Sequence, residues 1–154
     1  MPRNIHIGDD PVLRRKTQIV SQTQLKDQAI QDLADELLTL TEKLDGLGIA
    51  APQVGESLRI CVAVLAGRAQ VLINPRIVDH SIDKALGEEG CLSFPGLFGK
   101  VSRFESVTIE AQGRDGSPMH LELEKMDARV AQHEIDHLDG VVLPDRLSEN
   151  KDSR

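Results

Sequence analysis

Residues 127–138 read DARVAQHEIDHL, and this stretch decides the architecture of the chain. Its apolar residues recur at the spacing of one helical face, at Val130, Ala131, Ile135 and Leu138. Asp127 is a candidate N-cap, and the pair Asp139-Gly140 is a helix stop signal. The stretch therefore predicts a helix over residues 127–138 whose apolar face packs against a core.

The same helix carries the motif His-Glu-x-x-His at residues 133–137. Residues four apart on an α-helix are rotated by only about 40° from one another, so the imidazoles of His133 and His137 can bind one cation. Glu134 lies about 100° round the helix from His133, which suits a base that touches water beside a metal better than a third ligand. The alternative is a pair of partly exposed histidines on an amphipathic helix, but the apolar neighbours of the motif favour a metal site.

A catalytic metal site needs a third protein ligand and one open position. The residues after His137 contain no further histidine, and their only glutamate, Glu149, lies in a charged terminal segment. The third ligand is therefore expected upstream. Cys91 is the best candidate, because a thiolate is a strong ligand and residues 88–93 look like a tight loop; on spacing alone an inert loop cysteine stays possible. Cys61 lies in an apolar run and is expected to be a buried strand residue.

The rest of the chain predicts an α+β domain, with strands between two helices. Residues 23–43 carry an apolar stripe at helical spacing, and the glycine-containing break at residues 45–48 ends that helix. Strands are predicted at residues 58–65, at 71–73 with a stop at Asn74-Pro75, at 107–111 and at 120–123, the last two joined by a turn at Asp115-Gly116. A single domain is expected over 1–154, with residues 148–154 as a flexible tail.

The composition of the chain argues against several classes of protein. The formal net charge is −7 and aromatic residues make up 2% of the chain, which argues against sequence-specific nucleic-acid binding. No apolar run approaches the roughly 18 residues that a membrane span needs, and the first residues show no signal-peptide pattern. A cytoplasmic protein is expected, or else the mature form of a protein of the plastid stroma. Two cysteines do not suggest a disulfide framework.

Residues 46–55, GLGIAAPQVG, are a third distinctive stretch. The glycines permit positive φ and the close approach of another backbone. They match neither a dinucleotide-binding fingerprint nor a phosphate loop. The stretch therefore offers a surface of small residues with one amide side chain, that of Gln53.

Together, GLGIAAPQVG (46–55), EEGCLS (88–93) and QHEIDH (132–137) resemble the three signature motifs of peptide deformylases, in that family's order and at about its spacing. The resemblance runs from residues 10–14 to residues 144–146 and looks closer to the bacterial and plastid branch. It implies an α+β fold of antiparallel sheets packed around a central, C-terminal HExxH helix, with an N-terminal helix. The implied activity is a metal-dependent hydrolysis that removes the formyl group from formyl-methionyl nascent polypeptides and releases formate.

The resemblance also implies a role for each motif residue. Three residues bind the metal: Cys91, His133 and His137. Glu134 is then the general base and acid, and the oxyanion is stabilised by Gln53 and the backbone N–H of Leu92. The backbone that pairs with the substrate as an added strand is that of Gly46, Leu47 and Gly48. Val130, one turn before the motif, is expected to be a wall of the methionine pocket.

The cofactor that the resemblance implies is one divalent metal, Fe²⁺ in the cell, for which Zn²⁺, Ni²⁺ or Co²⁺ can substitute. The expected partners are N-formyl-Met nascent peptides, with transient ribosome association, and neither a specific nucleic acid nor a membrane. Phe98 and Lys100 depart from some bacterial members, which carry Arg in this region, so the contacts of those members beyond methionine do not carry over to this chain. Arg103 is expected to keep a positive charge nearby.

Three other readings stay open on the residues alone. A small HExxH endopeptidase is disfavoured because no downstream ligand is present. A structural metal-binding module normally uses four protein ligands; the spare candidates are Cys61, His6, His80 and His120, and the three histidines are each expected to be an ordinary surface or strand residue. A ribosome-binding factor without catalysis is disfavoured by the acidic balance of the chain.

Overall fold

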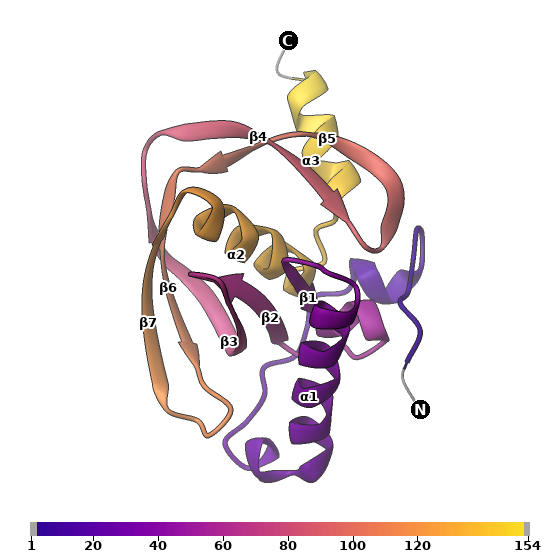
Figure 1. Ribbon diagram of the computed structural model, residues 1–154, viewed down its shortest axis with the longest axis vertical. Coiled ribbons are helices and arrows are strands. Elements are labelled where there is room, and N and C mark those ends of the chain that lie inside the picture. The colour runs from indigo at the N-terminus through magenta and orange to yellow at the C-terminus, as the bar shows by residue number, and fades with distance from the viewer. Residues whose placement is uncertain (1–2, 153–154) are drawn as a thin grey trace.

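Helix α2 (Lys125–Leu138) lies between a five-stranded antiparallel sheet and a separate two-stranded hairpin (Figure 1). This computed structural model describes residues 3–152. The sheet has the order β1-β2-β3-β6-β7, with bounds Gly48–Ala50, Ile60–Leu65, Arg68–His80, Ser106–Gln112 and Pro118–Glu124. The hairpin pairs β4 (Lys84–Cys91) with β5 (Phe94–Phe104). The predicted α+β fold, with antiparallel sheets around the HExxH helix, is confirmed.

Two further α-helices flank these layers. Helix α1 (Gln28–Lys43) packs beside the sheet, and α3 (Leu143–Asp152) packs on the hairpin, where the Leu147 side chain lies against Gly99 of β5. Short 3-10 helices occupy Pro11–Arg14 (η1), Gln24–Lys26 (η2) and Ala51–Val54 (η3). Within the part of the chain that the structure describes, no helix is long and apolar enough to cross a membrane.

Strand β2 shows why residues 60–65 are apolar without alternation. Ile60 and Val62 belong to the cluster that packs on α1, whereas Cys61 and Ala63 belong to the cluster that packs on α2. Since successive side chains of a strand point to opposite faces, both faces of β2 are buried. Cys61 is fully buried, as predicted, and this burial raises the pKa of its thiol well above the usual value.

Both predicted helices have different boundaries in the structure. The N-terminal helix does not start at residue 23: η2 comes first, and Asp27 is extended (ψ 132°) before α1 begins. Helix α2 starts at Lys125, and its N-cap is Glu124 rather than Asp127. The Asp127 carboxylate instead accepts a hydrogen bond from the N–H of Ala66, at 3.1 Å.

The predicted stop at Asn74-Pro75 is wrong, because β3 continues to His80. Asn74 has a φ of 53°, and the pairing with β6 shifts register between Ile73 and Arg76. The strand therefore bends at this point instead of ending. The Asn74 side chain holds the bend, because it accepts from the N–H of Val20 and donates to the Val20 carbonyl.

Four of the helices and strands were not predicted: β1, β4, β5 and α3. Residues 88–93, expected to be a loop, are the end of β4 and the tight turn into β5. Residues 148–152, expected to be a flexible tail, continue α3, and residues 153–154 lie outside the described residues. The predicted turn at Asp115-Gly116 does lie between β6 and β7, and Gly116 has a φ of 84°.

Candidate metal centre

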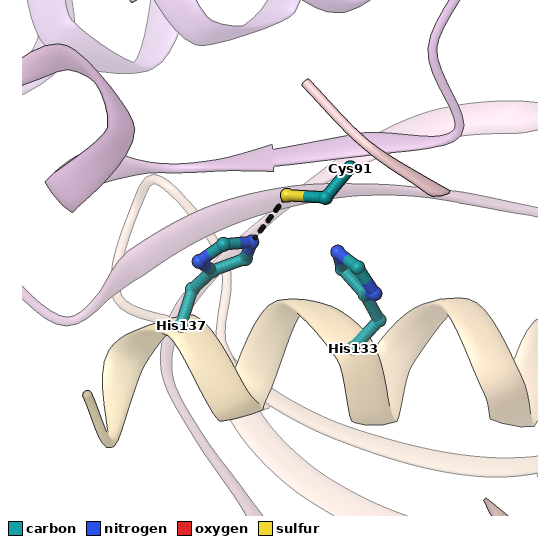
Figure 2. A group of neighbouring side chains, drawn as sticks. All are labelled: Cys91, His133 and His137. Atoms are coloured by element: carbon teal, nitrogen blue, oxygen red, sulfur yellow. Dashed lines mark hydrogen bonds between the residues drawn. The ribbon is translucent and has the colours of Figure 1, made fainter. Parts of the chain in front are cut away.

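Cys91, His133 and His137 bring one ligand atom each to within 4.8 Å of one another (Figure 2). Cys91 is the last residue of β4, and both histidines project from one face of α2. The Cys91 sulfur lies 3.3 Å from Nε2 of His137. One thiolate and two imidazoles suit zinc, iron and related transition metals, so the donor set fits a divalent cation.

His133 is oriented by a buried carboxylate. Its Nδ1 lies 2.9 Å from Oε1 of Glu89, which leaves Nε2 for the ligand group. Burial lowers the pKa of His133, but the hydrogen bonds to Cys91 and Glu89 outweigh it and raise that pKa to about 10. The position therefore favours positive charge, and a metal ion binds there in competition with a proton.

His137 differs from His133 in its protonation. Its side chain is 1% exposed, and its pKa is well below the usual value, first because of burial and then because of the charge of His133. It is therefore neutral, as an imidazole ligand must be. Its Nδ1 is buried and has no hydrogen-bond partner among the described residues.

Glu134 is a buried carboxylate poised beside the ligand group. It is 4% exposed, and this burial raises its pKa to about 7. Its Oε2 has no hydrogen-bond partner within the described chain. A Cβ at Gly48 of β1 would lie 2.9 Å from Cγ and Cδ of Glu134 and 2.6 Å from the Val62 carbonyl oxygen, so only glycine fits there. Strand β1 thus passes directly over the Glu134 side chain.

Gln53, in η3, faces the thiol side of the centre. Its Oε1 accepts a hydrogen bond from the N–H of Ala50 at 3.0 Å, which fixes the amide plane. Its Nε2 donates to Oγ of Ser93 at 3.1 Å and lies 3.8 Å from the Cys91 sulfur. A preorganised N–H donor therefore points toward the ligand group.

A cavity of about 490 Å³ opens onto these groups. Most of the predicted site residues line it: Gly46, Leu47, Gly48, Gln53, Cys91, Leu92, Val130, His133 and Glu134. His137 lies behind them, fully buried. At the rim, Leu47, Phe98 and Met126 are exposed apolar side chains. The structure therefore brings together the residues that were predicted to bind metal, to act in catalysis or to contact the substrate backbone and the methionine side chain.

Glu89 and Arg129 also belong to the surroundings of the centre, and neither was predicted from the sequence. Glu89 accepts from His133, Arg103 and Arg129, and the charge of Arg103 helps to hold the pKa of its carboxyl well below the usual range despite burial. The only signal was the acidic pair Glu88-Glu89, and spacing does not say which of the two is buried. Arg103 was expected to carry charge near the substrate; instead it is 4% exposed and pairs with Glu89 and Asp136.

The remaining histidines are not part of the centre. His6 pairs with Asp10, His80 stacks on Phe104, and the His120 side chain is largely exposed. Among the described residues the ligand group thus holds three protein ligands and faces a cavity, which is the pattern of a catalytic rather than a closed structural site.

Comparison with known proteins agrees with this geometry. The family model described as polypeptide deformylase matches residues 2–153. A peptide deformylase from Natranaerobius thermophilus is 42% identical over 149 residues, which are 96% of this chain and 93% of that protein. The chloroplastic peptide deformylase 1B of Solanum lycopersicum is 39% identical, over 97% of this chain and 54% of its own length. The Met-Ala-Ser-bound structure of a class I type b peptide deformylase from Acinetobacter baumannii has a TM-score of 0.91 at 31% identity, covering 95% of this chain and 98% of that one.

Proposed function

This chain belongs to the polypeptide deformylase family, and from that premise we propose how its own residues carry out the reaction. The reaction is the hydrolysis that removes the formyl group from the N-terminus of nascent polypeptides and releases formate. The observation that carries the proposal is the convergence of Cys91, His133 and His137 beside the unpartnered carboxylate oxygen of Glu134, at the floor of a cavity.

The metal ligands in this proposal are the Cys91 thiolate and the Nε2 atoms of His133 and His137. A divalent ion held there supplies Lewis acidity, which lowers the pKa of water towards about 7 in comparable zinc sites. A thiolate donates more charge than a neutral ligand and weakens that acidity, so an ion that accepts a fifth ligand suits the site. We therefore favour Fe²⁺ in the cell, with Zn²⁺, Ni²⁺ or Co²⁺ able to substitute.

Glu134 is the proposed base and acid. Its Oε2 accepts a proton from the attacking water as the water oxygen adds to the formyl carbon. The same carboxyl then delivers the proton to the amine nitrogen as the C–N bond breaks, and formate and a free N-terminus result. A pKa of about 7 suits both halves of this exchange near neutral pH.

Gln53 and Leu92 are the proposed oxyanion donors. The Gln53 amide is held by Ala50 and Ser93, so its N–H needs little reorganisation to reach the formyl oxygen. Leu92 follows Cys91 in the hairpin turn and lines the same cavity, which puts its backbone N–H near the ligand group. One such donor typically stabilises a transition state by about 2.7–4 kcal/mol.

The substrate is proposed to bind as a strand along Gly46, Leu47 and Gly48. Gly48 lies against Glu134, so a strand paired there carries its N-terminal group to the base. The methionine side chain would enter the apolar cavity, where Val130 is a buried wall. Support comes from the related Acinetobacter protein, which binds Met-Ala-Ser.

Comparing kcat/KM for three peptides tests this proposal: formyl-Met-Ala-Ser, formyl-Ala-Ala-Ser and acetyl-Met-Ala-Ser. Burial of the methionine side chain should favour the first over the second by about 2–3 kcal/mol. The acetyl peptide should be a much poorer substrate, because its extra methyl group must fit beside the metal. Equal rates for all three would indicate a general amidase and defeat the proposal.

The identity of the metal is tested separately, by metal analysis of protein purified without oxygen. If the native ion is Fe²⁺ bound to the Cys91 thiolate, air should inactivate the enzyme by oxidising one or the other. Replacement by Ni²⁺ should protect the activity. An iron-loaded enzyme that stays fully active through prolonged aeration would contradict the assignment.

The cellular setting is also part of the proposal. We place the enzyme, acting as a single domain over 1–154, where formylated chains emerge, in transient association with the ribosome. That place is the bacterial cytoplasm or, as the name of the tomato relative suggests, the plastid stroma. Co-sedimentation with translating ribosomes at physiological salt tests the association.

A further inference from the structure

A continuous series of charged hydrogen bonds leads from His133 to the C-terminal helix α3. Its members are His133, Glu89, Arg103, Asp136 and Arg146, which come from α2, β4, β5 and α3. Arg146 lies at its outer end and contacts neither the ligand group nor the cavity. The mechanism described above uses only its inner end.

The inner half of the series fixes the plane of the His133 ring. Glu89 accepts from Nδ1 of His133 at 2.9 Å, from Nε and Nη2 of Arg103 at 2.9 and 2.8 Å, and from Nη1 of Arg129 at 2.7 Å. Four donors use the acceptor sites of one carboxylate, so Glu89 cannot turn independently of Arg103. The orientation of the His133 imidazole therefore depends on where the Arg103 guanidinium lies.

The outer half of the series fixes the guanidinium of Arg103. Arg103 donates through Nη1 to Oδ2 of Asp136, and the same oxygen accepts from Nε of Arg146 at 2.9 Å. Nη2 of Arg146 donates to the other oxygen, Oδ1, at 2.7 Å, so Arg146 grips Asp136 in a two-point contact. Both oxygens of Asp136 are thereby held, and one of them is shared between the two arginines.

Charge and burial make this arrangement sensitive to the loss of Arg146. The side chains of Arg103, Glu89 and Asp136 are 4%, 6% and 14% exposed. Water therefore screens them little, and removal of one partner from such a buried network is costly. Without Arg146, Asp136 would have Arg103 as its main charged partner and would draw the guanidinium away from Glu89.

We propose that Arg146 is a positioning residue for the metal centre: through Asp136, Arg103 and Glu89 it sets the orientation of the His133 imidazole. The inference rests on the proposed role of His133 as a metal ligand. Helix α3 thereby has a specific function beyond covering the hairpin.

The test compares two arginines that tie α3 to the body of the protein. Arg14 pairs with Asp145 of α3 at 2.8 and 2.9 Å on the exposed surface, with no link to the ligand group. Arg14→Met therefore removes one surface ion pair of α3. Arg146→Met removes the pair with Asp136 and also an exposed pair with Glu149 within α3, and only Arg146 belongs to the series. Co²⁺ is the probe: its dissociation constant and its d–d absorption spectrum report ligand geometry without any assay of activity.

Mutation of a group that hydrogen-bonds directly to a metal ligand typically lowers metal affinity about 10–100-fold. Because three side chains separate Arg146 from His133, we expect Arg146→Met to weaken Co²⁺ binding by about three- to tenfold and to shift the spectrum. Arg14→Met should change neither. Arg146→Lys should recover part of the loss, since it restores the charge without the two-point contact.

Two results would overturn the inference. One is an Arg146→Met protein that binds Co²⁺ within twofold of the parent with the same spectrum; the other is an equal effect of Arg14→Met, which would indicate general loosening of α3. Thermal unfolding of each metal-free variant separates a loss of fold from a loss of metal affinity. Failure of the proposed function looks different: the unaltered protein would then bind no stoichiometric Co²⁺, or His133→Ala would bind it as well as the parent.

Discussion

Helix α2 and the hairpin β4–β5 both contribute ligands to the metal centre, but they hold them by different means. The two histidines of α2 sit on a helix whose apolar face is buried in the core, with Ala131 and Leu138 fully covered. The hairpin has little apolar burial, and Leu86 and Phe98 are 64% and 66% exposed. What anchors it near Cys91 is charge: Glu89 bonds to Arg103 within the hairpin and to Arg129 and His133 of α2.

One half of the centre therefore depends on apolar packing, and the other half depends on a buried ionic network. Helical spacing alone sets the distance between His133 and His137. The place of Cys91 depends on contacts between segments distant in the chain, since Glu89 is 40 residues from Arg129 and 44 from His133. Variants that act on only one half should therefore separate catalysis, stability and metal binding.

The largest expected effect is on the chemistry carried by α2. Glu134→Gln keeps the shape of the side chain but cannot accept a proton, so kcat should fall about 10²–10⁴-fold. The metal content should not change, because Glu134 is not one of the three proposed ligands. Steady-state kinetics together with metal analysis measures both. Turnover within tenfold of the parent would remove Glu134 as the base.

The next effect concerns the network that anchors the hairpin. Glu89→Gln leaves the buried Arg103 and the partly buried Arg129 short of a negative partner, so the free energy of unfolding of the metal-free protein should fall by about 3–5 kcal/mol. Glu88→Gln, at the exposed neighbouring position, should change it by less than about 0.5 kcal/mol. Urea unfolding measures both variants. Equal losses would mean that the hairpin is not held by this network.

The third effect is a gain in stability, and it again concerns Glu134 of α2. Burial raises the pKa of Glu134 from 4.5 to about 7, so the folded, metal-free protein binds a proton that the unfolded chain has already lost between these pH values. The charged carboxylate thus costs stability that grows as the pH rises from about 4.5 to 7 and is constant above that. Glu134→Gln should therefore stabilise the metal-free protein by about 3 kcal/mol at pH 8 and by almost nothing at pH 4.

Unfolding of metal-free protein in urea across this pH range checks that prediction. A gain that is independent of pH would show that the cost of Glu134 is not electrostatic. A loss of stability at pH 8 would show that the carboxylate has a partner that compensates for its burial.

The smallest of the four effects is on the ligand of the hairpin. Cys91→Ser replaces the proposed thiolate ligand with a hydroxyl, which ionises far less readily than a thiol. Loss of a group that hydrogen-bonds to a metal ligand typically lowers metal affinity by about 10–100-fold, so loss of a ligand itself should lower it by roughly 100-fold. Competition with a chelator of known affinity measures this. Cys61→Ser at the buried strand cysteine is the control and should leave metal stoichiometry unchanged. An unaltered affinity in Cys91→Ser would exclude Cys91 as a ligand.

The contrast between the two regions also explains which elements could be predicted. Residues 127–138 and 60–65 carry apolar patterns that survive in the fold because those segments are buried. The strands β4 and β5 gave no such signal, because few of their residues are buried and Gly87, Gly90 and Gly99 interrupt them. These glycines leave room for side chains of other elements. Arg129 fills the space beside Gly87, and Leu147 fills the space beside Gly99.

The helix, its two histidines and the adjacent glutamate follow from local sequence, because a spacing of one to four residues on a helix fixes the directions of the side chains without any other part of the chain. The chemistry of a thiolate made Cys91 the best candidate for the third ligand, and the resemblance of three short motifs supported it and added Gln53. Three features come from tertiary contacts alone: Glu89 rather than Glu88 is buried against His133, Gly48 lies on Glu134, and Arg103 turns inward to Asp136. Those outcomes depend on burial and on charge pairs between distant segments, and no local pattern in the chain encodes which partners will meet.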